Sequence, residues 1–166
     1  MTTCRRPTAA LLLLLAAAPA ALAQDAKAPR EPDPGVVAFL KEANLPYQLD
    51  NGDFRLEYDV DGTRGQRVWI DSDTAKLDKL EFRAVWSVAA RGKGAVPAEL
   101  ATLLLRENAR MVVGAWQVNQ GQDDYLVVFS APVSAAADAA TLREVLEVVM
   151  YSTDRIEKQL SGKDEF

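Results

Sequence analysis

The sequence predicts an α+β fold: an antiparallel sheet of about five strands with three helices, in the order α-β-β-β-α-β-β-α. Two observations predict it. Segments in which apolar and polar residues alternate follow one another through tight turns, as antiparallel strands do. Segments with apolar residues at helical spacing are set apart from these runs, which argues against a parallel, doubly wound sheet.

The predicted domain begins with a short amphipathic helix at residues 35–44. Val36, Phe39 and Leu40 recur at helical spacing, and an Asn-Leu-Pro sequence stops the segment. Three or four strands follow, with Asn-Gly and Asp-Gly as turn signals between the first of them. These candidate strands are residues 47–50, 54–60, 66–71 and 79–89.

The second half adds a helix, a pair of strands and a long helix. Leu100, Leu103 and Leu104 give helical spacing to residues 98–111, and Pro97 suits the first turn. A polar Asn-Gln-Gly-Gln-Asp-Asp turn then joins two apolar strands. The strands are residues 112–118 and 125–131, and the long helix is residues 137–160.

The first 23 residues have the features of a secretory signal peptide in their usual order. Arg5 and Arg6 precede an apolar run at residues 9–18, and an Ala-Leu-Ala cleavage site ends at Ala23. The apolar run is shorter than the roughly 20 residues that span a bilayer, and no later stretch qualifies. We therefore expect a periplasmic or secreted chain that starts at Gln24 and has no membrane span.

The rest of the chain is expected to be one domain with two short extensions. Residues 24–34 carry three prolines and little to bury, which predicts a mobile leader. Residues 35–160 have the length of a common single domain. Residues 161–166 are charged and are expected to be a frayed tail.

The residues that are missing exclude most catalytic chemistry. The chain has no His, and its one Cys, Cys4, lies in the signal peptide. A Ser-His-Asp triad, a Cys-His pair and a zinc site built on His or Cys are therefore excluded. Removing residues 1–23 leaves 17 Lys and Arg against 24 Asp and Glu, a net charge of −7, with no basic patch. We expect no cofactor, no metal, no catalytic residue and no nucleic-acid partner.

Two stretches resemble a known family. They are LLLRENARMVVGAWQVNQGQDDYLVVFSAPV and the helix TLREVLEVVMYSTDRIEKQL. Together with the order of elements, they resemble the YbjN-like family, which is similar in fold to the small chaperones of type III secretion systems. The resemblance covers residues 36–160. It implies the same α+β fold and a non-catalytic, chaperone-like or regulatory role.

The step from the second helix into the next strand is a candidate site that we interpret as a structural joint. Asn108 stands near the end of the helix and is able to hydrogen-bond a neighbouring turn, while Gly114 allows a close approach. Trp116 alternates with Val118 and is expected to enter the core. An isolated Asn, Gly and Trp supply no acid, base or nucleophile.

The acidic residues offer two further candidates. Asp59 and Asp61 begin a Ca²⁺-like sequence, but the EF-type pattern needs Gly at its sixth position and Glu at its twelfth, where the chain has Arg64 and Ile70. A pair of solvated turns is the expected structure. Asp154 lies in an apolar part of the last helix, where we expect a hydrogen-bonded structural carboxylate.

A second apolar face of the sheet is the candidate for function. A strand pair that is apolar on both faces is either covered by a helix of its own chain or presents a surface to a partner. On the second interpretation, Val128→Asp leaves the fold intact and abolishes self-association or client binding. The candidate partner-binding residues are Trp69, Val85, Val113, Ala115, Leu126 and Val128.

The sequence thus favours an exported, non-catalytic binding or chaperone-like module. It would bury a protein client or a second copy of itself, as a homodimer, against its sheet. The alternative is a cofactor-free hydrolase of the carboxylate type, acting on a cell-envelope saccharide or peptide. A sensor or regulatory subunit is a third interpretation that the residues do not separate from a chaperone.

Overall fold

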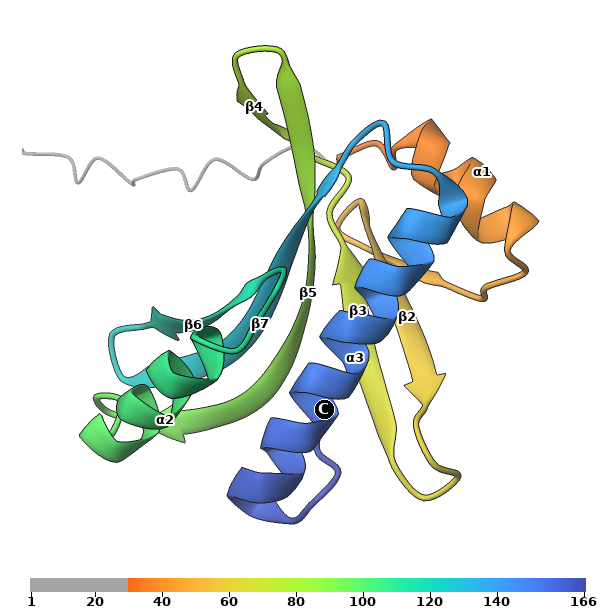
Figure 1. The fold of residues 1–166 in the computed structure, drawn as a ribbon. Coiled ribbons are helices and arrows are strands. Elements are labelled where there is room, and N and C mark those ends of the chain that lie inside the picture. Colours follow the sequence, from red (N-terminus) through yellow and green to blue (C-terminus); the bar gives the residue numbers. More distant parts are fainter. Residues whose placement is uncertain (1–29) are drawn as a thin grey trace, which may run out of the picture.

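The computed structural model describes residues 30–166, and the predicted α+β class is confirmed (Figure 1). Seven strands, where about five were expected, form one antiparallel sheet. Two of them, the first and the fourth, have only three residues each. The elements are α1 (Pro34–Glu42), β1 (Gln48–Asp50), β2 (Asp53–Asp59), β3 (Gly65–Ile70), β4 (Ala75–Leu77), β5 (Leu80–Lys93), α2 (Ala98–Asn108), β6 (Ala115–Gln120), β7 (Asp124–Ser134) and α3 (Ala139–Ser161).

The long strand β5 organises the sheet. The strand order is β1-β2-β3-β5-β7-β6, and β4 also pairs with β5. β5 pairs with β7 along its length, and the register shifts between Val88 and Ala90. This irregularity gives β5 one extra residue, and such bulges bend a strand and increase its twist. β5 is visibly bent in Figure 1.

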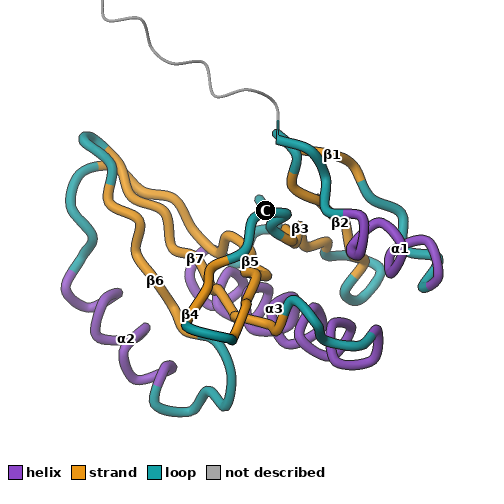
Figure 2. Tube along the Cα trace, turned by 90° about the horizontal axis from the view of Figure 1, so that it is seen from above, coloured by secondary structure: helices purple, strands orange, loops and turns teal. Residues whose placement is uncertain are grey.

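All three helices bury their apolar residues on the same face of the sheet. The buried apolar residues of α1, α2 and α3 belong to one core cluster with Val68, Val85 and Phe129 of the strands. Figure 2 shows α3 beside the middle of the sheet, with α1 and α2 toward its two ends. Among residues 30–166 no helix packs against the opposite face, which we call the open face.

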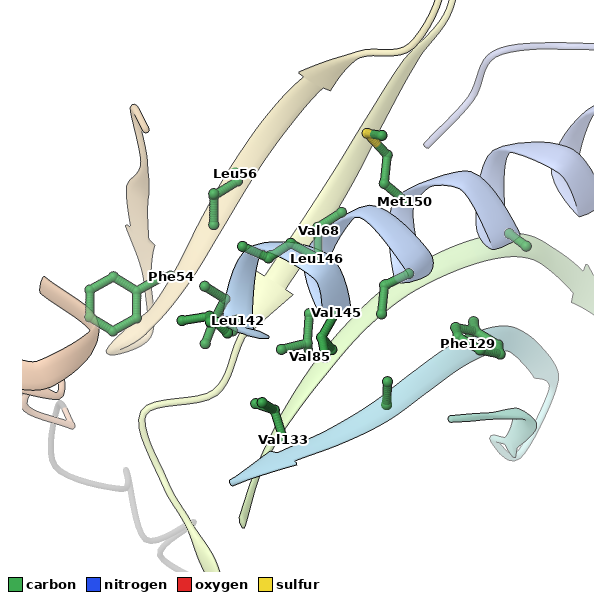
Figure 3. Close-up of a cluster of buried hydrophobic side chains, with 14 of the residues drawn as sticks. Phe54, Leu56, Val68, Val85, Phe129, Val133, Leu142, Val145, Leu146 and Met150 are labelled. Carbon is green, nitrogen blue, oxygen red and sulfur yellow. The ribbon is translucent and has the colours of Figure 1, made fainter. Parts of the chain in front are cut away.

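Helix α3 carries the largest share of this packing. It lies mainly against β5, and also against β7 and β3. Its buried residues follow a spacing of three and four, which places them in one stripe. Each fully buried apolar side chain contributes about 1.5–3 kcal/mol. Figure 3 shows Leu142, Val145 and Leu146 of this stripe directed toward Val85 and Val68 of the sheet.

The sheet is open between β3 and β5 over the first part of β3. Only Trp69 and Ile70 of β3 pair with β5. Before them, Gln66 bridges the gap by donating from Nε2 to Ser87 Oγ at 2.8 Å and to the Val88 carbonyl at 3.1 Å. The N–H of Arg67 donates to the carbonyl of Phe166 at 3.1 Å. Side chains and the end of the chain therefore replace a missing strand contact.

The expectation of a frayed tail is wrong for this reason. Glu157 of α3 is fully buried, and its Oε1 accepts from the N–H groups of Glu165 at 2.6 Å and Phe166 at 3.1 Å. The left-handed Gly162, with φ of 66°, turns the chain from the end of α3 toward β3. The charged side chains of residues 161–166 suggested that the segment is exposed to solvent, but its backbone N–H groups donate to the buried Glu157.

The Asn108 side chain connects the end of α2 to the start of β6. Asn108 Oδ1 accepts from the Trp116 N–H at 2.6 Å, and its Nδ2 donates to the Trp116 carbonyl at 3.2 Å. Gly114 has a φ of 80°, and a Cβ there would lie 2.8 Å from the Phe129 ring. Trp116 is buried against Phe129, with ring centroids 5.0 Å apart. The Asn side chain thus satisfies both backbone groups at the start of an edge strand.

We expect Asn108→Ala to lower the free energy of unfolding by about 1–3 kcal/mol, because it leaves a partly buried donor and acceptor without partners. Urea unfolding followed by tryptophan fluorescence measures the change. Asn119→Ala on the exposed side of β6 is the matched control and should change the stability by less than about 0.5 kcal/mol. Equal effects of the two substitutions would contradict this account of the joint.

Candidate functional site

The open face of the sheet is formed by alternate residues of β5, β7 and β6. Strand register places Trp86, Ser130 and Ala115 in one row across the three strands. Ala84 and Pro132 form the next row. Small side chains therefore dominate the middle of this face, and a surface built on small side chains is hollow.

A groove of about 620 Å³ occupies this part of the open face. Its floor comes from β5, β7 and β6, and residues between β3 and β4 form one wall. The groove is thus open to solvent, apolar on its floor and acidic at one side. Its lining includes Asp71, Asp73, Arg83, Ala84, Ala115, Gln117, Ser130 and Pro132.

Four of the six predicted partner-binding residues lie on the open face. Ala115 lines the groove. Leu126 and Val128 alternate on β7 with the buried Val127 and Phe129, so they point away from the helices. Trp69 alternates with the buried Val68 and Ile70 in the same way. The position of these residues matches the prediction, and their binding role stays a prediction.

The assignment of Val85 to this face is wrong. Val85 is fully buried, opposite Ala131 and Ile70 in the core, and points toward α3 (Figure 3). The apolar residues of β5 at even positions suggested that they form its core face. Instead, the core face carries Arg83 and Ser87, both buried with polar partners. Arg83 pairs with Asp33 at 3.0 Å, and Ser87 Oγ donates to the Arg67 carbonyl at 2.5 Å.

The assignment of Val113 to the open face is also wrong. Val113 precedes β6 instead of belonging to it, and it packs against the helix-covered core. It contributes to a separate hollow beside α3. The predicted strand at 112–118 started three residues too early, because the turn at Gly114 interrupts an apolar run that reads as continuous strand.

Val128 differs from its neighbours on the open face. Its exposed fraction is only 4% although no described helix covers it. Its cross-strand partners are Val88, which is also buried, and Gln117. Side chains on the same bent surface therefore cover it. The expectation that Val128→Asp leaves the fold intact is wrong on this geometry, because a charge there would be buried without a partner.

Two tryptophans adjoin the groove, and the sequence identified only one of them. The rings of Trp69 and Trp86 are stacked with centroids 4.6 Å apart and an angle of 6° between their planes. Trp86 Nε1 donates to Asp71 Oδ1 at 2.7 Å, and Trp69 Nε1 donates to Asp50 Oδ2 at 3.1 Å. Trp86 alternates along the sequence with Ala84 and Val88. That alternation indicates one face of β5 without indicating which face the helices cover.

The carboxylates at the groove are held by neighbouring cations and donors. Arg30 donates to Asp53 and to Asp73, at 2.7 Å in each case. Burial raises the pKa of Asp71, against the hydrogen bond from Trp86, which lowers it. Among residues 30–166 no group of three or more Asp, Glu, His or Cys residues is placed to hold a metal ion. This wall of the groove therefore offers hydrogen-bond acceptors whose negative charge is partly balanced by Arg30.

A second charged cluster lies away from the groove and supports the fold. Arg64 Nε donates to Asp154 at 2.6 Å, and its Nη2 donates to Glu157 at 3.3 Å. Asp154 is thus the structural carboxylate that the sequence predicted. Asp154 and Glu157 share one guanidinium, so they do not flank a cleft as the paired carboxylates of a glycosidase would.

The Asp59 and Asp61 segment forms the solvated turns that the sequence predicted. Asp61 Oδ1 accepts from the N–H groups of Thr63 and Arg64, at 3.0 Å in each case. Asp59 accepts from the N–H of Gly62. These carboxylates hold the loop between β2 and β3.

Among the described helices, none is both long enough and apolar enough to cross a bilayer.

Comparison with known proteins gives a likeness in fold. No family model matches the chain, and no curated protein matches it. One solved structure that matches is the crystal structure of YbjN from E. coli, a proposed transcription regulator, at 11% sequence identity and a TM-score of 0.49. The match covers 77% of this chain and 90% of that chain.

Glu157 makes the stability depend on pH. Burial raises the pKa of Glu157 above its ordinary value of 4.5, although the N–H groups of Glu165 and Phe166 and the charge of Arg64 lower it. A raised folded-state pKa contributes stability that is present below the ordinary pKa and is lost as pH rises through the raised value. We expect the unfolding free energy of the wild type, relative to Glu157→Gln, to fall as the pH rises above the ordinary pKa of 4.5.

Urea unfolding of both proteins at several pH values measures this difference. The Gln side chain keeps an oxygen that is able to accept from Glu165 and Phe166, so the comparison isolates the charge. A difference that rises with pH, or stays constant, would show that the ion pair with Arg64 outweighs burial.

Proposed function

We propose that this chain is a non-catalytic binding module that holds a segment of a protein partner, or of a second copy, in the groove of its open face. One observation carries the proposal: the three helices cover one face of the sheet, and the opposite face has a solvent-open hollow with an apolar floor. A preformed hollow of this kind is the usual form of a binding site. The polar residues around this apolar floor also favour a specific contact.

The lining of the groove indicates the chemistry of the bound segment. Ala84, Ala115 and Pro132 offer apolar contact to small side chains. Asp71 and Asp73 stand at one wall, where Asp73 is paired with Arg30, so this wall offers carboxylate oxygens to N–H and O–H donors of the partner. Exported chains of this kind would meet such partners in the cell envelope.

We expect Ala115→Arg to abolish binding in the groove, because the long side chain fills the hollow from its edge strand. Stability should change by less than about 1 kcal/mol, since the position is partly exposed on an outer strand. Asn119→Arg is the matched control: it adds the same side chain to the same face of β6 outside the groove. Val128→Asp, by contrast, should lower the free energy of unfolding by about 2–4 kcal/mol.

Two measurements carry this test. Light scattering during size-exclusion chromatography gives the mass of the purified protein, and a dimer should be split by Ala115→Arg and kept by Asn119→Arg. If the protein is a monomer, phage-displayed peptides are selected for binding to the wild type. The binding of the selected peptides to Ala115→Arg and to Asn119→Arg is then measured. Peptides that lose binding only with Ala115→Arg support the groove. A monomer that selects no such peptide would rule the proposal out.

Export is the second part of the proposal, and it concerns residues outside those the structure describes. The signal-peptide pattern at residues 1–23 supports it. We expect the protein recovered from the periplasm of a Gram-negative host to begin at Gln24. Intact-mass spectrometry measures this end, and Ala23→Arg should block cleavage because the site needs a small residue. An uncleaved wild-type chain retained in the cytoplasm would contradict export.

A further inference from the structure

A second surface, on the helix side of the molecule, carries a separate inference. The loop after α2 and the outer side of α3 enclose a hollow of about 590 Å³. Val112 at the tip of the loop is fully exposed, and Tyr151 and Val148 of α3 are 56% and 38% exposed. Met111 and Val113 continue the apolar lining. We call this surface the loop–helix groove, and it is distinct from the groove of the open face.

The exposure of Val112 is built into the fold. On its N-terminal side, the N–H of Met111 donates to the carbonyl of Asn108 at 3.2 Å. On its C-terminal side, Gly114 takes a left-handed conformation against Phe129, and Trp116 is tied to the side chain of Asn108. Both ends of the loop are therefore anchored, and the valine is presented to solvent by a defined backbone instead of by a loose one.

The apolar residues of α3 have the spacing of helix-recognition anchors. Val148 and Tyr151 stand three residues apart, so they lie on one side of the helix beside the loop. Apolar contacts that a helix and a loop offer together suit the apolar face of another helix, as in groove-bound amphipathic helices. An extended strand would need an open sheet edge, which this surface lacks.

The charges around this groove select the partner. Glu144 and Glu147 of α3 line it, and neither forms an ion pair within residues 30–166. The cation on the rim, Arg110, is paired with Glu107 at 3.1 Å, a carboxylate that it shares with Arg155. The lining of the groove therefore carries two carboxylates against one arginine, which makes it net negative beside its apolar residues. That combination complements a helix with one apolar face and basic residues beside it.

We propose that the loop–helix groove binds a basic amphipathic helix of a partner protein. A second copy of this chain is a poorer occupant, because a symmetric contact would bring the same carboxylates of two acidic chains together. The anchored Val112 would enter the apolar face of the partner helix, between Tyr151 and Met111. Glu144 and Glu147 would meet its Lys or Arg side chains.

A model peptide tests the proposal. The probe is a fluorescein-labelled 18-residue peptide of Leu and Lys, with Leu on one helical face, and its binding to the purified protein is followed by anisotropy. Val112→Asp should weaken binding at least about tenfold, a change of about 1.4 kcal/mol. Leu77→Asp is the matched control, because Leu77 is also exposed but lies on β4. It should leave the affinity unchanged.

Charge is tested in the same assay. Glu144→Gln with Glu147→Gln should weaken binding and reduce its dependence on salt, whereas Glu42→Gln on α1 should do neither. A peptide with Glu in place of Lys should not bind. Ala115→Arg should have no effect, which separates this surface from the open face. Absent binding, or binding that Val112→Asp leaves intact, would overturn the proposal, and so would a dimer that Val112→Asp splits.

Discussion

Burial of one stripe of α3 against the bent sheet is the constraint on which the rest of this structure depends. The helix reaches β5, β7 and β3 at once, so the sheet has to bend along its longest strand to follow it. The irregularity at Ala89 supplies that bend while keeping Val85 and Ala90 toward the core. Because the helices of residues 30–166 occupy this face alone, the described part of the chain leaves a solvent-open hollow on the other face.

The same constraint explains the buried polar groups. A strand that bends away from its neighbour leaves backbone groups without partners, and β3 leaves β5 after two residue pairs. Gln66, Ser87 and the end of the chain fill that gap, and Glu157 holds the end of the chain in place. Removing one member of such a buried network lowers the stability, because it leaves the other members without hydrogen-bond partners. The only Cys of the chain is Cys4, so these segments are connected by a network of buried polar groups and not by a disulfide.

The joint at Asn108 and Gly114 has two effects. The Asn108 side chain bonds the backbone groups of Trp116 at the start of edge strand β6, and the joint also fixes the loop that exposes Val112. An apolar residue presented in this way has an entropic advantage in binding, since little order has to be imposed when a partner arrives. The open face and the loop–helix groove lie on different sides of the sheet. We propose both as surfaces for recognition, and within residues 30–166 neither assembles an acid, a base and a nucleophile.

The sequence by itself determined the class of fold, the order of the main elements and the structural character of Asn108, Gly114, Trp116 and Asp154. These follow from local periodicity, turn residues and the chemistry of single side chains. Tertiary structure decided which face of each strand is covered. Alternation along β5 has two faces, and only the position of α3 places Val85 inside and Trp86 outside. It also decided the fate of residues 161–166, because a charged segment is able to bury its backbone when a partner such as Glu157 is brought to it from elsewhere in the chain.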